Sequence, residues 1–273
     1  MLGAVKEPAV TRDGSGELML MLLADARLPT GAHTQSAGLE PAMNAGVTVD
    51  RVPDYIAARL ATVTTVEAGA AVVARHVTTA WSSVTRTRDR SSTARPLQRS
   101  RIHATVSPAE EGEVTELAEL TGALAEVDTA WAARTMSPAI RQASQLAARG
   151  YLRLIRTLWP GRPEIDALQR LPAPGRAVVL GVAAAVTGLS AAQLVRLVAN
   201  DDVATIAAAV LKVHPVDPAR TTGWVLAAHP QIEAMAGELA GLTVPEQIPA
   251  RAAPLIEEWA EIHATTTQRL FRA

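Results

Sequence analysis

The stretch AVVLGVAAAVTGLSAAQLVRLVA (177–199) gives the clearest indication of the fold. Its first four residues could begin a buried strand, but the alanine-rich continuation favours a helix that ends near Thr187. Ser190 is followed three residues later by Gln193, which is a capping box and predicts a second helix over 191–199. The stretch therefore predicts two apolar helices joined by a tight turn.

The composition of the whole chain also favours helices packed on helices. Of the 273 residues, 48% are hydrophobic but only 3% are aromatic, so Ala, Leu and Val must fill the core. Small side chains let helices approach closely, whereas sheets usually contain more aromatic residues. Apolar residues recur at helical spacing over 52–70 and 114–134. We therefore expect a single all-α domain of about ten packed helices over residues 17–273.

Cap and breaker residues divide the pattern into individual helices. Ser137 suits an N-cap and Pro138 suits the first helical position, so a helix is expected to begin there. Residues 160–175 are rich in proline and glycine, and we expect them to form a connector between helices. The remaining helices are expected at 202–213, 221–229, 231–240 and 254–271.

Two segments lack this helical pattern. Residues 1–16 show no periodicity and are expected to form a disordered tail. Residues 82–112 are rich in Arg, Ser and Thr, and we interpret them as a flexible insertion that leads into an acidic helix start. The alternative is an arginine patch for a phosphate or an acidic partner, formed by Arg86, Arg88, Arg90, Arg95, Arg99 and Arg101.

The sequence contains no recognisable catalytic or metal-binding motif. A net charge of −1 argues against a general binder of nucleic acid or anionic membrane, and the absence of cysteine excludes disulfides and thiolate chemistry. No two histidines have the spacing of a helical metal-ligand pair, although one histidine per chain could join a site shared across an oligomer. Neither lysine follows a phosphate-binding glycine loop.

The longest apolar run, 177–186, is far shorter than the ~20 residues that span a bilayer. We expect a soluble, cytoplasmic protein that is not an enzyme.

Residues 28–40 (LPTGAHTQSAGLE) resemble the N-terminal signature of UreF-type urease accessory proteins. In this segment Ala32 replaces a glycine of the signature, and His33 and Gln35 replace its two aromatic residues. Two further segments resemble parts of the same family in the same order: SPAIRQAS (137–144), and the C-terminal residues from His263 to the RLF of 269–271. The resemblance covers most of residues 17–273.

The resemblance implies an all-α homodimer without catalysis. Proteins of this family form a complex with the accessory protein UreD (also called UreH) and the GTPase UreG, and the complex delivers nickel to apo-urease. The chain would then need no catalytic, cofactor-binding or metal residues, because its partners carry the nickel and the GTP. The matched residues become candidates for the partner interfaces: Pro29, Gly31, His33, Ser36, Gly38, Glu40, Arg141, Ser144, His263, Arg269, Leu270 and Phe271.

Several alternatives stay open at this point. Leu270 and Phe271 could dock into a groove on a partner, or they could pack on their own domain. The chain could also be a helical DNA-binding regulator that uses the Arg86–Arg101 cluster, or an all-α enzyme with an unrecognised active site.

Overall fold

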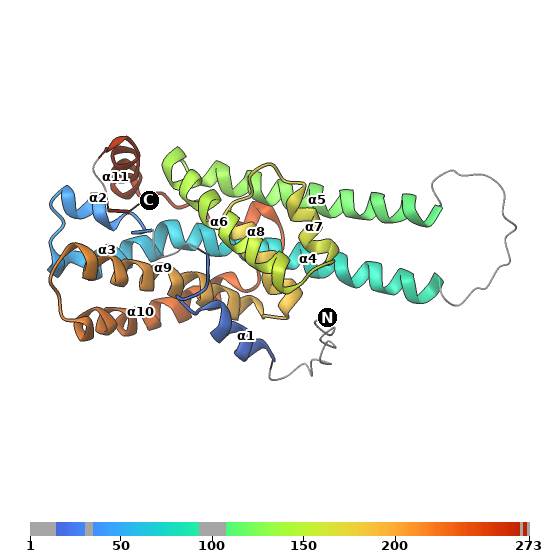
Figure 1. Cartoon of the computed structure of the whole chain (residues 1–273), viewed down its shortest axis with the longest axis horizontal. Coiled ribbons are helices and arrows are strands. Elements are labelled where there is room, and N and C mark those ends of the chain that lie inside the picture. Colours follow the sequence, from blue (N-terminus) through green and yellow to red (C-terminus); the bar gives the residue numbers. More distant parts are fainter. Residues whose placement is uncertain (1–14, 31–34, 93–107, 268–269, 272–273) are drawn as a thin grey trace, which may run out of the picture.

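The computed structural model describes residues 15–30, 35–92, 108–267 and 270–271, and these form one packed all-α domain (Figure 1). The part of the chain that is described contains no strand, which confirms the expected fold class. Its α-helices are α1 (Ser15–Leu23), α2 (Leu39–Asn44), α3 (Val52–Arg59), α4 (Thr65–Ser92), α5 (Pro108–Arg134), α6 (Pro138–Leu158), α7 (Pro163–Gln169), α8 (Arg176–Thr187), α9 (Ala191–Val213), α10 (Pro218–Leu239) and α11 (Pro254–Thr265).

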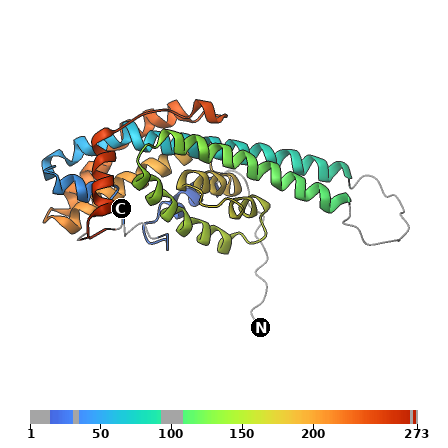
Figure 2. The same cartoon turned by 90° about the horizontal axis from the view of Figure 1, so that it is seen from above.

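Helix α4 is the central element of the domain. It packs against α8, α9 and α5, while α10 lies along α9 on the outer side. In both views, α4 and α5 run side by side and extend together beyond the other helices (Figure 1, Figure 2). The opposite end of the domain gathers α2, α3 and α11 around the C-terminal segment (Figure 1).

Helices α4 and α8 approach closely because α8 has a glycine at their crossing. A Cβ atom at Gly181 would lie 2.5 Å from the Ala71 carbonyl oxygen and 2.6 Å from Ala74 Cβ. By contrast, a Cβ atom at Gly122 on α5 would meet nothing within 4 Å. The small side chains of the core therefore allow α4 and α8 to pack this closely, which larger side chains would prevent.

Matched glycine-to-alanine substitutions test this packing. Gly181→Ala should lower the free energy of unfolding by about 1–3 kcal/mol, because the methyl group overpacks the interface between α4 and α8. Gly122→Ala should raise it by up to about 1 kcal/mol, because alanine favours an exposed helix. Urea unfolding followed by circular dichroism measures both changes. A Gly181→Ala variant as stable as Gly122→Ala would contradict the close helix crossing.

The break in the helical pattern is shorter than the expected 82–112. Helix α4 continues to Ser92 and α5 begins at Pro108, so residues near both ends of the proposed insertion are helical. The serine and threonine side chains fit this helix because they donate to carbonyl oxygens one turn earlier, as Thr87 does to Ser83 at 2.9 Å. The Trp81 indole also donates to the Glu116 carbonyl oxygen at 2.9 Å, which joins the two helices. Residues 1–14 and 93–107 lie outside the described residues.

Local cap predictions are confirmed, but four of the expected divisions of the chain are wrong. Ser137 caps α6 with Pro138 in its first turn, and Ser190 forms the capping box of α9. The helices expected at 191–199 and 202–213 are one helix, α9, and those expected at 221–229 and 231–240 are one helix, α10, with Pro230 inside it. The connector contains a short helix, α7. Helix α11 ends at Thr265 instead of 271, because the last residues turn back toward α2.

One continuous helical stretch, residues 49–87, is long and apolar enough to cross a membrane by length and composition alone. However, 72% of its most apolar window is buried inside the domain. A helix at the core of a folded domain is buried in this way, and α4 packs against α5, α8 and α9.

Candidate functional site: a pocket joining the three motif segments

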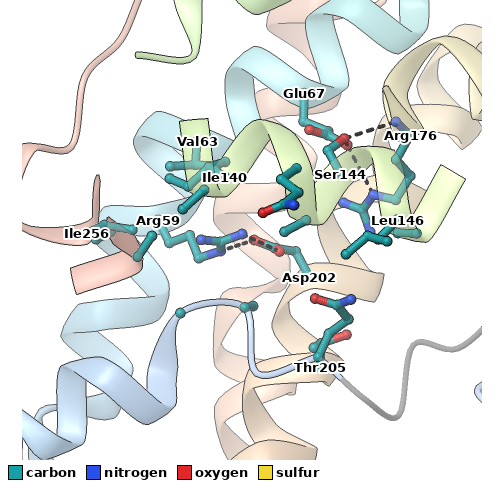
Figure 3. Close-up of a pocket in the computed structure, with 18 of the residues that line it drawn as sticks. Arg59, Val63, Glu67, Ile140, Ser144, Leu146, Arg176, Asp202, Thr205 and Ile256 are labelled. Atoms are coloured by element: carbon teal, nitrogen blue, oxygen red, sulfur yellow. Dashed lines mark hydrogen bonds and ion pairs between the residues drawn. The ribbon is translucent and has the colours of Figure 1, made fainter. Parts of the chain in front are cut away.

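All three segments that resemble the UreF signature reach a single pocket of about 420 Å³. Residues from α2, α3, α4, α6, α8, α9 and α11 line it, together with the chain that precedes α2 and the turn between α3 and α4. Gly38 comes from the first segment, Ser144 from the second and His263 from the third. Segments that are far apart in the sequence therefore form one site (Figure 3).

The corner before α2 has a backbone that requires glycine. Gly38 has a φ of 76°, and Ala37 beside it has a φ of 51°, so both lie in the left-handed region. The Tyr55 hydroxyl donates to the Ala37 carbonyl oxygen at 2.8 Å, and a Cβ at Gly38 would lie 2.8 Å from that hydroxyl. Ser36 is buried beside them. The first motif thus shapes the backbone of the pocket wall.

The segment around Pro29 lies against α6. The Pro29 carbonyl oxygen accepts a hydrogen bond from Arg153 at 3.4 Å. The backbone of Thr30 crosses α6 at Gly150, where a Cβ atom would clash with the Thr30 carbonyl group. Gly31 and His33 lie outside the described residues.

Glu40 connects the first motif to the C-terminus. Its carboxylate is buried and lies 2.9 Å from His263 Nε2. It also accepts hydrogen bonds from the backbone N–H groups of Leu270, at 2.7 Å, and Phe271, at 3.0 Å. A single carboxylate therefore ties α2, α11 and the C-terminal segment together.

The two apolar residues at the C-terminus have different roles. Phe271 is only 3% exposed and its ring lies 5.0 Å from the Lys212 ammonium, so this residue packs on its own domain. Leu270 is 73% exposed and remains available at the surface. Arg269 lies outside the described residues.

Arg141 and Ser144 support the start of α6 in different ways. The Arg141 guanidinium donates to the carbonyl oxygens of Thr135 and Met136 at 2.6 and 2.9 Å, so it closes the connection between α5 and α6. Ser144 lies deeper. Its hydroxyl accepts from the Arg176 backbone N–H at 2.9 Å and donates to Glu67 at 3.3 Å.

The pocket floor contains a network of ionised side chains that the sequence analysis did not identify (Figure 3). Asp202 accepts from Arg59 at 2.8 and 3.1 Å, and from the Thr64 hydroxyl at 2.6 Å. Arg176 lies between two carboxylates, 3.0 Å from Glu67 and 2.7 Å from Asp201. These residues belong to four different helices, so no local motif reveals them. The one available signal was the presence of charged residues at otherwise apolar helical positions.

A π-helical turn, η3 (Leu60–Thr64), joins α3 to α4 beside this network. The Thr65 hydroxyl stabilises the turn by donating to the Leu60 carbonyl oxygen at 2.6 Å. Turns of this type are rare and often occur at functional sites. Here the turn places Arg59, Val63 and Glu67 together on the pocket.

Burial perturbs the titration of several groups at the site. It raises the pKa of Tyr55 to about 12 and raises the pKa of Tyr151 as well, so both hydroxyls are neutral at physiological pH. Burial also raises the pKa of Asp201, although Arg176 opposes the shift. For Asp202, burial acts in the same direction, but Arg59, Arg176 and Thr64 together outweigh it and the pKa is lowered. Within the described residues, no group of three or more His, Asp or Glu is arranged to hold a metal ion.

Comparisons with known proteins assign the family. The UreF family model matches residues 47–229, which run from just before α3 into α10. A urease accessory protein UreF from Mycolicibacterium vanbaalenii is 29% identical over 254 residues, covering 92% of this chain and 96% of that protein. Another, from Mycobacterium marinum, is 34% identical over 208 residues, covering 75% of this chain and 77% of that protein. The chain therefore belongs to the UreF family of urease accessory proteins.

Proposed function

We propose that this protein is a non-enzymatic scaffold for urease maturation in the cytoplasm. It acts as a homodimer, binds UreD and the GTPase UreG, and helps them to assemble the nickel centre of apo-urease. The observation that carries the proposal is the convergence of the three family segments on one site, where Glu40 holds the C-terminal segment against α2 and α11. A protein that binds partners needs such a fixed surface.

The charges at the site support a scaffold role. Each of the pocket carboxylates Glu67, Asp201 and Asp202 is ion-paired with an arginine. Carboxylates that are engaged in this way are poor metal ligands, because a cation would have to displace the guanidinium group. We therefore propose that the partner proteins hold the nickel and the GTP.

The exposed apolar side chains near the C-terminus are the proposed partner surface. Leu255 and Ile262 are seven residues apart on α11, and so lie on the same face of that helix. Both are exposed, as is Leu270 at the end of the tail. Exposed apolar side chains at a fixed site are typical of a protein interface.

Co-purification tests this surface. We expect the wild-type chain to retain UreD and UreG from a co-expressing cell, and Leu270→Asp to retain at least about tenfold less, because an unpaired carboxylate is costly to bury in an apolar contact. Leu226→Asp is the matched control, since Leu226 is 66% exposed on α10 and lies outside the three family segments. Equal retention by both variants would place the interface elsewhere, and a wild-type chain that retains neither partner would contradict the scaffold role.

The DNA-binding alternative gains no specific support from the described residues. Arg86, Arg88 and Arg90 continue α4, which pairs with α5, and the chain has a net charge of −1.

A further inference from the structure

The pocket beneath the three motif segments has an imbalance of charge. Among the charged residues described there, the three carboxylates Glu67, Asp201 and Asp202 face only the two guanidinium groups of Arg59 and Arg176. Arg59 and Thr64 occupy both oxygens of Asp202. The remaining cation, Arg176, is shared between two acids. The excess negative charge therefore lies on the Glu67 and Asp201 side of the pocket.

Asp201 has an oxygen that is free to accept another donor. Within the part of the chain that the structure describes, only Arg176 bonds its carboxylate, and it does so at Oδ2. The side chain is 20% exposed, and it lines the pocket. Burial raises the pKa of this carboxyl group, so the ionised form would be stabilised by a further cation.

Apolar side chains also line the pocket, namely Val63, Ile140, Leu146 and Ile256. In Figure 3, Leu146 lies beside Arg176 and the other three lie around Arg59. These side chains come from η3, α6 and α11. A ligand would therefore meet hydrocarbon along its length and a carboxylate at its end.

We propose that this pocket binds a cationic head on a short apolar chain, with the head at Asp201 and the chain along Ile140 and Leu146. This is the chemistry of an arginine or lysine side chain of a partner protein, and also of a free alkylamine or alkylguanidine. Binding of an anion is disfavoured, because the guanidinium groups of Arg59 and Arg176 are already ion-paired with carboxylates. A bare metal ion would need several uncommitted oxygens. The inference does not depend on the role in urease maturation.

Titration of the full-length, ¹⁵N-labelled protein with n-butylguanidinium tests the proposal. We expect saturable amide shifts in α6 and around Asp201 at millimolar concentrations. N-butylurea is the matched neutral ligand, with nearly the same shape and no charge, and it should bind at least about tenfold more weakly because it lacks the charge-assisted hydrogen bond. No localised shifts with the cation, or equal binding of the two ligands, would overturn the proposal.

Two variants separate the charge from the cavity. Asp201→Asn removes the charge and keeps an oxygen for Arg176, so it should weaken cation binding by about tenfold or more. Asp54→Asn changes the net charge equally at an exposed position on α3, and should leave binding unchanged. Ala143→Leu fills the pocket without altering any charge, and should also abolish binding. The amide spectrum of each variant verifies its fold, and unchanged binding in both Asp201→Asn and Ala143→Leu would overturn the site.

The source of the cation is resolved by a second titration. A short blocked peptide with one central arginine presents the same head from a polypeptide backbone. If it produces the same pattern of shifts at least as tightly as n-butylguanidinium, the site serves a partner's side chain. If only the free cation binds, the site serves a small molecule. Both results support the proposed chemistry of the pocket. If neither ligand binds, the proposal is contradicted.

Discussion

Replacing Arg176 with methionine is expected to destabilise the domain by about 3–5 kcal/mol, because it leaves the buried carboxylate of Glu67 and the partly buried carboxylate of Asp201 without their cation. Arg176 reaches Glu67 on α4 and Asp201 on α9 from the first turn of α8, so it connects three helices of the core. A loss of this size is a large share of the stability of an ordinary domain. Methionine preserves most of the side-chain volume, so the effect reports on charge and hydrogen bonding rather than on a cavity.

The control for this substitution is Arg196→Met. Arg196 forms an ion pair of similar length with Glu233, at 2.7 Å, but that pair is exposed between α9 and α10. Exposed pairs contribute about 0–1 kcal/mol, because solvent screens them. Urea unfolding of both variants gives the comparison. Equal losses would show that the Arg176 network is not the buried link that its geometry indicates.

Glu40→Ala should release the C-terminal segment from the domain. The substitution removes the carboxylate that contacts His263 and accepts from the N–H groups of Leu270 and Phe271. Hydrogen bonds to a charged group contribute roughly 1.5–3 kcal/mol each, so exchange of the two amide protons should accelerate on the order of 100-fold. Phe271 would leave its buried position, and Leu270 would lose its fixed place at the surface.

Hydrogen exchange measured by NMR checks this release directly. Glu258→Ala on α11 is the control, because Glu258 is an exposed acidic residue close to the same region. We expect the control to leave the protection of Leu270 and Phe271 unchanged. Slow exchange at both amides in Glu40→Ala would contradict the role of Glu40 in holding the tail.

The sequence predicted those parts of the structure that depend on local chemistry. The small aliphatic composition indicated a helical domain, and the caps at Ser137 and Ser190 were located correctly because a cap is made within a few residues. Residues of the three family segments line the candidate pocket, but the sequence did not indicate the contacts that unite them. Glu40 was expected to matter, but the N–H groups of Leu270 and Phe271 that it binds are more than two hundred residues away in the chain.

The errors arose where long-range partners override local signals. The sequence analysis separates helices at 191–199 and 202–213, yet Asp201 and Asp202 lie inside the single helix α9, where Arg176 and Arg59 form ion pairs with them. Likewise, Pro230 was expected to separate two helices but lies within α10. The charged network of the pocket could not be predicted from the sequence, because its residues come from helices that meet only after folding.

The most direct test of the scaffold role is the nickel content of urease. Urease, UreD and UreG would be co-expressed from the same source with the wild-type chain, with Glu40→Ala, or with no UreF chain, and the purified urease assayed for bound nickel and activity. We expect nickel-loaded, active urease with the wild-type chain, much less with Glu40→Ala, and almost none without the chain. Equal nickel loading with and without the chain would contradict a role in assembling the metal centre.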